Sequence, residues 1–217
     1  MIKQPEKYKK PLLFVMGAAF TVGLVGIPMT LDTPEYFKVS SLFLLASAVL
    51  LLLFHQGERK RLAITMVLVA FLGWLVEVIG VKTGAVFGSY GYGLSLGPKV
   101  LDVPVLIGLN WAMLIYMTFL ATAMLPLTNR RLTASAGLMV LYDIMLEPAA
   151  SKLGMWQFAN NDVPFQNYVV WFLLSMLFLQ LVRYSKASYY NPIAVPLFWM
   201  QLIFFMLLNI IFFAIKA

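Results

Sequence analysis

Residues 138–150 read LMVLYDIMLEPAA and place two carboxylic acids, Asp143 and Glu147, inside a stretch apolar enough to cross a membrane. Their spacing puts both acids on one face of a helix. An ionised side chain at the centre of a membrane helix costs roughly 2.5 to 3.5 kcal/mol, so the first hypothesis for such acids is a functional site. Pro148 follows Glu147 directly, and we expect it to end or kink the helix.

The rest of the chain is also strongly apolar. Of its 217 residues 62% are hydrophobic and 12% are charged, and the mean hydropathy is +0.87. Soluble domains are roughly 45 to 50% apolar and about 25% charged. We therefore expect an all-α integral membrane protein, and with no repeat or shift in composition we expect one membrane domain over residues 1–217.

Several kinds of site are excluded or disfavoured by what the sequence lacks. Cysteine is absent, which excludes disulfides, thiol catalysis and thiolate metal sites. His55 is the one histidine, so we expect no metal site. The formal charge of +7 comes from basic residues in short loops between apolar runs, which favours orientation in a bilayer over nucleic-acid binding.

Seven apolar runs are long enough to cross a bilayer core of about 30 Å. They are residues 12–31, 39–54, 62–80, 103–127, 132–150, 168–182 and 192–215. Most of the 16 Lys and Arg residues precede the first run or lie in the loops 55–61, 128–131 and 183–191. The positive-inside rule therefore predicts a polytopic bundle with the N-terminus in and the C-terminus out.

This topology brings the polar residues of the spans to one membrane depth. Glu77 would lie near the outer end of the third helix, with Asp143 and Glu147 in the outer half of the fifth and Asn110 at a similar depth in the fourth. The two long loops, 81–102 and 151–167, open on the same side and carry Tyr90, Tyr92, Trp156 and Asn167. We expect these loops to cap a polar cavity.

Some of these residues also have simpler explanations. Asp143 and Glu147 could form a structural pair that is hydrogen-bonded across helices, and Asn110 and Asn167 could either orient water or bridge helices. Trp111, Trp156 and Trp171 fit an interfacial aromatic belt as well as a cavity wall. Asp102, two residues before Pro104, is interpreted first as a helix N-cap.

Two groups of residues carry a resemblance to a known family. They are Glu77, Gly80, Thr83, Gly84, Phe87, Gly88, Tyr90, Tyr92, Leu96, Gly97, Val103, Pro104, Asn110 and Trp111, followed by Asp143, Glu147, Pro148, Gly154, Trp156, Pro164, Asn167 and Trp171. In this pattern the chain resembles the carotenoid biosynthesis membrane protein family, which includes gamma-carotene 1',2'-hydratases and bisanhydrobacterioruberin hydratases.

The resemblance implies a carotenoid hydro-lyase that needs no cofactor and adds water across a terminal C1=C2 bond. An acid would protonate C2, and water would add to the tertiary cation at C1. On this hypothesis Glu147 and Asp143 handle the proton, and Glu77 completes the acidic cluster. Substrate or water would contact Asn110, Trp111, Tyr90, Tyr92, Trp156, Asn167 and Trp171.

The implied partners are a lycopene or gamma-carotene-like polyene, membrane lipid and other enzymes of the pathway, and we expect the prokaryotic cytoplasmic membrane as the location. Two alternatives remain open. A carotenoid end-group cyclase or isomerase would use the same acid and exclude water. A non-enzymatic carotenoid or lipid carrier would use the acids as a relay or as part of a binding surface.

Overall fold

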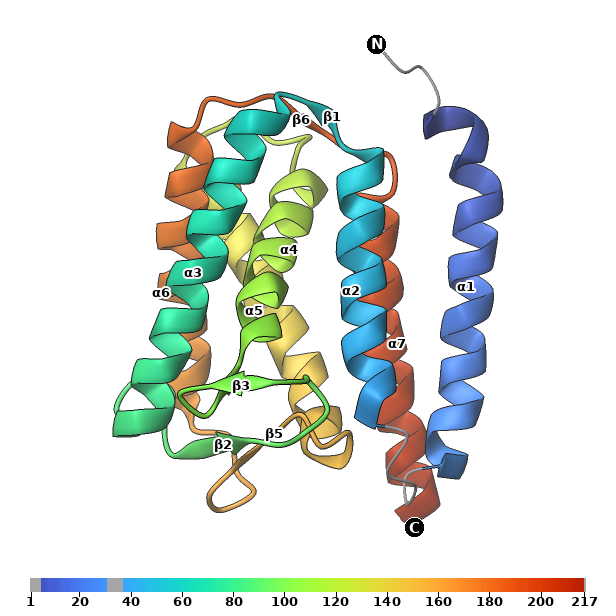
Figure 1. Ribbon diagram of the computed structural model, residues 1–217, viewed down its shortest axis with the longest axis vertical. Helices are drawn as coiled ribbons and strands as arrows, with labels where there is room; N and C mark the ends of the chain where they lie inside the picture. Colours follow the sequence, from blue (N-terminus) through green and yellow to red (C-terminus); the bar gives the residue numbers. More distant parts are fainter. Residues whose placement is uncertain (1–4, 31–36, 217) are drawn as a thin grey trace.

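The computed structural model describes residues 5–30 and 37–216, and within them seven helices alternate in direction to form a bundle (Figure 1). The helices are α1 (Pro5–Thr30), α2 (Phe37–Phe54), α3 (Arg59–Thr83), α4 (Val105–Ala121), α5 (Asn129–Lys152), α6 (Phe165–Tyr184) and α7 (Ala194–Lys216). The all-α prediction with seven helices is confirmed. The predicted end of the first span, residue 31, lies outside the described residues.

The described helices include four that are long and apolar enough to cross a membrane: Lys7–Thr30, Arg59–Thr83, Phe165–Tyr184 and Ala194–Ile215. Two shorter apolar helices, Val39–Phe54 and Val105–Ala121, accompany them. Apolar side chains also cover the outside of the bundle, as at Phe14, Val67 and Phe213. The chain is an integral membrane protein.

Helix α4 is shorter than the predicted span, and the proline in α5 does not end that helix. α4 ends at Ala121 and not near residue 127. Pro126 accounts for part of this difference, because a proline disfavours helical geometry in the residue before it. Conversely, α5 continues through Pro148 to Lys152, so the proline does not end that helix. Membrane helices tolerate an internal proline where neighbouring groups satisfy the freed carbonyl.

Helices α3 and α4 approach each other closely at two glycines. A Cβ on Gly73 would lie 2.8 Å from the Trp111 Cβ, and one on Gly108 would lie 2.3 Å from the Ala70 carbonyl oxygen. Only glycine allows this approach without displacing the neighbour. Glu77 is one turn beyond Gly73, so the contact fixes where its carboxyl group meets α4.

Short antiparallel strand pairs, which the sequence did not predict, join the loops. At one end of the bundle β2 (Tyr90–Tyr92) pairs with β5 (Trp156–Phe158), and β3 (Lys99–Val100) pairs with β4 (Val103–Pro104). At the other end β1 (Gln56–Gly57) pairs with β6 (Tyr189–Tyr190). Figure 1 shows the first two pairs beneath α3, α4 and α5. The two long loops therefore cap the bundle together.

The interpretation of Asp102 as an N-cap is wrong. The N-cap of α4 is Pro104, and Leu101 and Asp102 have φ angles of 54° and 68° between β3 and β4. Positive φ at both central residues is typical of a tight hairpin turn. The Asp102 carboxylate forms an exposed ion pair with Lys82 at the end of α3.

Candidate functional site

The pairing of β2 with β5 brings four aromatic side chains to the inner face of the cap. In the register of this pair, Tyr90 is directly opposite Phe158 and Tyr92 is directly opposite Trp156 on the neighbouring strand. Alternate residues of a strand point to opposite faces, so these four share one face. Gln157, between the two inward residues of β5, is exposed. The cap thereby places two hydroxyl groups and an indole N–H at this end of the bundle.

Glu77 accepts three hydrogen bonds inside the bundle and is 4% exposed. Trp111 Nε1 donates to its Oε1 at 2.9 Å, whereas the Tyr90 and Tyr92 hydroxyls donate to its Oε2 at 2.5 and 2.7 Å. An ionised carboxylate only accepts hydrogen bonds, so three donors match its anionic form. Burial, reinforced by the Glu77 charge, raises the pKa of Tyr90 and of Tyr92 well above the ordinary value, which keeps both as donors.

Glu147 and Asp143 project from α5 toward different neighbours. Trp156 Nε1 donates to Glu147 Oε2 at 3.0 Å, and Asn167 Nδ2 donates to Asp143 Oδ2 at 2.7 Å. Asp143 is fully buried, and its Oδ1 has no hydrogen-bond partner among the described residues. The two acids of the helix are therefore held in different ways.

A small space, here called the acid cavity, lies between these groups and has a volume of about 20 Å³. That volume is enough for one water molecule, which needs about 10 to 15 Å³ on this measure. Its lining combines two carboxyl groups with an amide and aromatic rings. The lining residues are Glu77, Phe87, Tyr90, Tyr92, Ile107, Glu147, Trp156, Phe158, Asn167 and Trp171.

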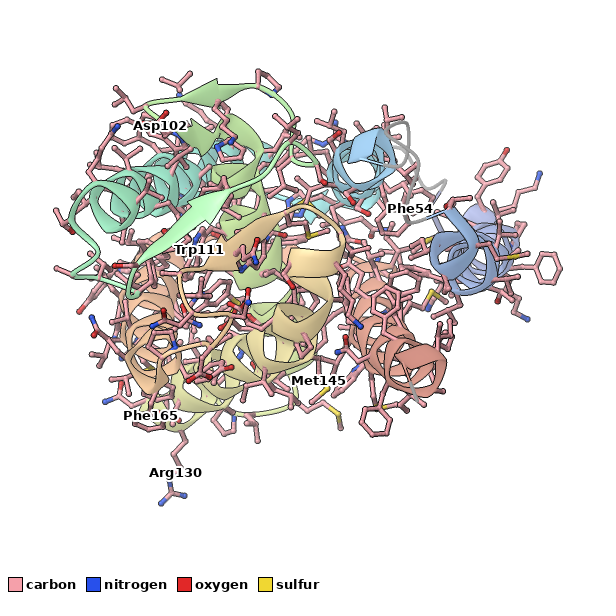
Figure 2. The ribbon with its side chains drawn as sticks, turned by 90° about the horizontal axis from the view of Figure 1, so that it is seen from below. Phe54, Asp102, Trp111, Arg130, Met145 and Phe165 are labelled. Carbon is pink, nitrogen blue, oxygen red and sulfur yellow. The ribbon has the colours of Figure 1, made fainter. Side chains whose placement is uncertain are left out.

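The wall of the acid cavity is braced by two stacked indoles. The rings of Trp111 and Trp171 lie 4.2 Å apart between centroids, with 25° between their planes. Viewed from the capped end, Trp111 lies toward the middle of the ring formed by α3, α4, α5 and α6 (Figure 2). Trp171 lines the acid cavity. Trp111 does not line it, but donates a hydrogen bond to Glu77, which does.

The carboxyl groups of the site have no basic partner among the described ion pairs. Those pairs join Arg61 to Glu58 and Lys82 to Asp102, and both are exposed. Each buried acid is held instead by neutral donors. Because no basic group neutralises these carboxyl groups, each can act as an anion or as a proton donor in a reaction.

Not every residue predicted for the site lines the acid cavity. Asp143 and Trp111 do not line it: Asp143 accepts a hydrogen bond from Asn167, and Trp111 contacts Glu77 and Trp171. Asn110 lines a separate apolar cavity, whose other residues include Leu146 and Gln201.

Three residues that line the acid cavity were not among the predicted site residues. Phe87 lies in the first long loop, residues 81–102, and Phe158 follows Trp156 at the spacing of alternate strand residues. A strand assignment for WQF would have found Phe158. Ile107 gives no signal that separates it from other apolar residues of α4.

The profile of the family described as carotenoid biosynthesis protein matches residues 37–216. The chain is 29% identical over 161 residues to bisanhydrobacterioruberin hydratase of Haloarcula japonica, an alignment that covers 70% of this chain and 54% of the relative. The chain thus spans about half the length of this curated relative. No solved structure matches the chain.

Proposed function

Because the chain belongs to the carotenoid biosynthesis protein family, we propose that it adds water across the terminal C1=C2 double bond of an acyclic carotenoid. The observation that carries this proposal is the acid cavity: Glu77 and Glu147 face one space the size of a water molecule inside an apolar bundle. The similarity to a hydratase supports the same reaction. A proton, a cation-stabilising anion and a water site are what the reaction requires.

Glu147 is the proton donor in this proposal. It lines the acid cavity and is fixed through one oxygen by the Trp156 indole, while Glu77 supplies a second carboxyl group on the same cavity. Transfer of the Glu147 proton to C2 would form the new C–H bond and leave a tertiary cation at C1. General acids positioned in this way contribute typically 10² to 10⁴ in rate.

Glu77 stabilises the cation. Its three donors hold the carboxylate in one orientation before the reaction begins. A carboxylate about 5 Å from a cation, at an effective dielectric constant of about 20, lowers the energy by about 3 kcal/mol. Trp171 lines the same cavity, and its ring would add attraction of the cation–π type.

Asn167 positions the water that completes the reaction. Its amide group lines the acid cavity and is oriented by the hydrogen bond from Nδ2 to Asp143. Water would add to C1 and release one proton to the Glu147 carboxylate, which restores the acid. Asp143 is a positioning residue in this scheme, because it acts through Asn167.

The substrate proposed is a lycopene or gamma-carotene-like polyene dissolved in the bilayer, and the protein is proposed to cross the prokaryotic cytoplasmic membrane several times with its N-terminus in. The capped end of the bundle would then lie in the outer leaflet. Membrane lipid surrounds the helices, and enzymes that supply the acyclic polyene are the partners proposed.

Expression in cells that make lycopene or gamma-carotene, followed by mass analysis of the pigments, tests the function. Wild-type protein is expected to add one water to the carotenoid. Glu147→Gln and Glu77→Gln are each expected to lower product formation at least a hundredfold. Glu58→Gln serves as the matched control, because Glu58 is exposed and forms a surface pair with Arg61.

Three results would contradict the proposal. An isomer of unchanged mass would indicate cyclisation or isomerisation. Pigment that is bound and recovered unchanged would indicate a carrier. Full hydration by both glutamine variants would remove the proposed roles of the two acids.

A further inference from the structure

A second cavity lies beside the acid cavity and is almost entirely apolar. It has a volume of about 140 Å³ and is formed by side chains of α1, α2, α4, α5 and α7 together with Leu96, Leu153, Met155 and Trp156. Its polar residues, which include Asn110 and Gln201, are uncharged. The chemistry of this lining suits a hydrocarbon ligand without a charged group.

The two cavities share a wall. Ile107 of α4 and Trp156 of β5 line both of them. Ile107 is 2% exposed and Trp156 is 7% exposed, so both fill the space between the cavities. The Trp156 indole N–H also donates a hydrogen bond to Glu147, so one residue of the shared wall directly contacts a carboxyl group of the acid cavity. The end of a ligand packed against these two side chains in the apolar cavity would therefore lie next to the acid cavity.

The opposite side of the apolar cavity reaches the outside of the bundle between α1 and α2. Ala19 of α1 and Val39 and Phe43 of α2 line it and are themselves exposed. Figure 1 shows α1 at the edge of the bundle, beside α7 and α2. An apolar surface at this position faces lipid tails, so a hydrophobic molecule could enter sideways from the membrane.

The volume sets how much of a ligand fits. A dry cavity of about 150 Å³ lined by aliphatic and aromatic side chains binds a molecule the size of benzene. The apolar cavity therefore holds about one isoprenoid unit, and the remainder of a long chain would extend through the opening into the bilayer. A flexible saturated lipid chain would also fit by composition, but it carries no double bond to present to Glu147.

We propose that the apolar cavity binds the terminal isoprenoid unit of an acyclic polyene that enters between α1 and α2, and that Ile107 and Trp156 position its end against the acid cavity. This inference rests on the proposed function for the reaction but names a separate binding site. Trp156 is a positioning residue: its ring bounds the substrate site, and its N–H orients Glu147.

The test uses the purified full chain in lipid nanodiscs with lycopene as the probe. Lycopene is achiral and acquires visible circular dichroism when it is held in a chiral site, so this signal reports binding without turnover. Ala19→Trp places a large ring in the cavity opening, whereas Ala18→Trp makes the same change at an adjacent exposed position that does not line the cavity. Both variants change an exposed helix position, so both are expected to fold.

Wild-type protein and Ala18→Trp are expected to give the same saturable signal. Ala19→Trp is expected to weaken lycopene binding at least tenfold and to raise the lycopene concentration needed for half-maximal hydration by a similar factor. Trp156→Phe keeps a ring but loses the N–H, so its turnover should fall about tenfold while the binding signal is retained.

The outcomes separate this inference from the proposed reaction. Saturable binding that Ala19→Trp abolishes, without any hydrated product, would support the cavity and contradict the hydratase. Hydration with the same half-saturation in Ala19→Trp and Ala18→Trp would overturn the cavity and leave the reaction standing. Absence of an induced signal in wild-type protein, or a phospholipid held there in place of lycopene, would also overturn the proposed site.

Discussion

Gly73 of α3 lies directly against the side chain of Trp111 on α4, and Trp111 in turn donates its indole N–H to Glu77, one helical turn from that glycine. The absence of a side chain at one position thus sets the orientation of a carboxylate at another. The close packing of α3 against α4 therefore also determines the geometry of the buried Glu77 carboxyl group.

A methyl group at this contact should therefore change the site. Gly73→Ala is expected to push the Trp111 ring away from Glu77, to destabilise the protein by about 1 to 3 kcal/mol through overpacking, and to lower turnover. Gly137→Ala on α5 is the control, since a Cβ at that position meets nothing within 4 Å. Thermal unfolding and pigment conversion measure the two effects. Equal unfolding temperatures and equal pigment conversion in the two variants would show that the contact between Gly73 and Trp111 affects neither stability nor turnover.

The hydroxyl groups of Tyr90 and Tyr92 should matter more for the reaction than their rings do. Removal of one hydrogen bond to a charged group costs about 1.5 to 3 kcal/mol. Tyr92→Phe and Tyr90→Phe are each expected to lower the hydration rate about tenfold or more while leaving the amount of folded protein unchanged. Tyr184→Phe changes an exposed tyrosine at the other end of the bundle and is expected to have no effect. Wild-type rates in both site variants would remove the proposed role of these donors.

The cap formed by β2 and β5 depends on Gly93. A Cβ on this residue would lie 2.0 Å from the Gly154 carbonyl oxygen, and the Gly93 N–H donates to the Met155 carbonyl oxygen at 2.8 Å. Gly93→Ala should separate the two loops and abolish hydration. Gly91→Ala, in the same cap, has open space at its Cβ and should retain activity. Full activity of Gly93→Ala would mean that the cap is not needed.

His55 at the opposite end of the bundle should give the stability a dependence on pH. Burial, followed by the charge of Arg59, lowers the pKa of His55 from its ordinary value of 6.5. Below that value the unfolded chain takes up a proton that the folded protein resists, so stability falls as the pH drops from 7.5 to 5.5. The Nδ1 atom pairs with the Tyr116 hydroxyl at 2.8 Å in the folded state.

His55→Phe isolates this effect, because it removes the titrating group and keeps a ring of similar shape. The unfolding midpoint of wild-type protein is expected to fall more between pH 7.5 and 5.5 than that of the variant. The same fall in both proteins would assign the pH dependence to other groups. An increase in wild-type stability on acidification would contradict the lowered pKa of His55.

Sequence reasoning found the helices and the acids because both depend on local patterns. Apolar runs of membrane length predict helices, and a polar residue inside such a run is conspicuous. Alternation of direction along the chain then brings Glu77, Asp143 and Glu147 to one end of the bundle. Their convergence at similar depth, and the capping by the two long loops, could be predicted in this way.

The partners of each acid could not be predicted, because they depend on rotation about helix axes and on pairing between distant loops. Neighbouring residues on a helix point about 100° apart. Trp111 therefore reaches Glu77, while Asn110 beside it lines the apolar cavity. Likewise, the register that sets Tyr92 opposite Trp156 joins segments more than 60 residues apart in the chain. No local pattern specifies such a pairing.

In the proposed reaction, water from the acid cavity becomes a hydroxyl group at C1 of the carotenoid end. To follow this oxygen atom, purified wild-type protein in nanodiscs is given lycopene in water enriched in heavy oxygen. The product is then analysed by mass spectrometry with fragmentation. The expected product is heavier by one labelled water, with the label in a hydroxyl group at C1 of the terminal unit. Lycopene recovered at its original mass, or a product whose oxygen carries no label, would contradict it.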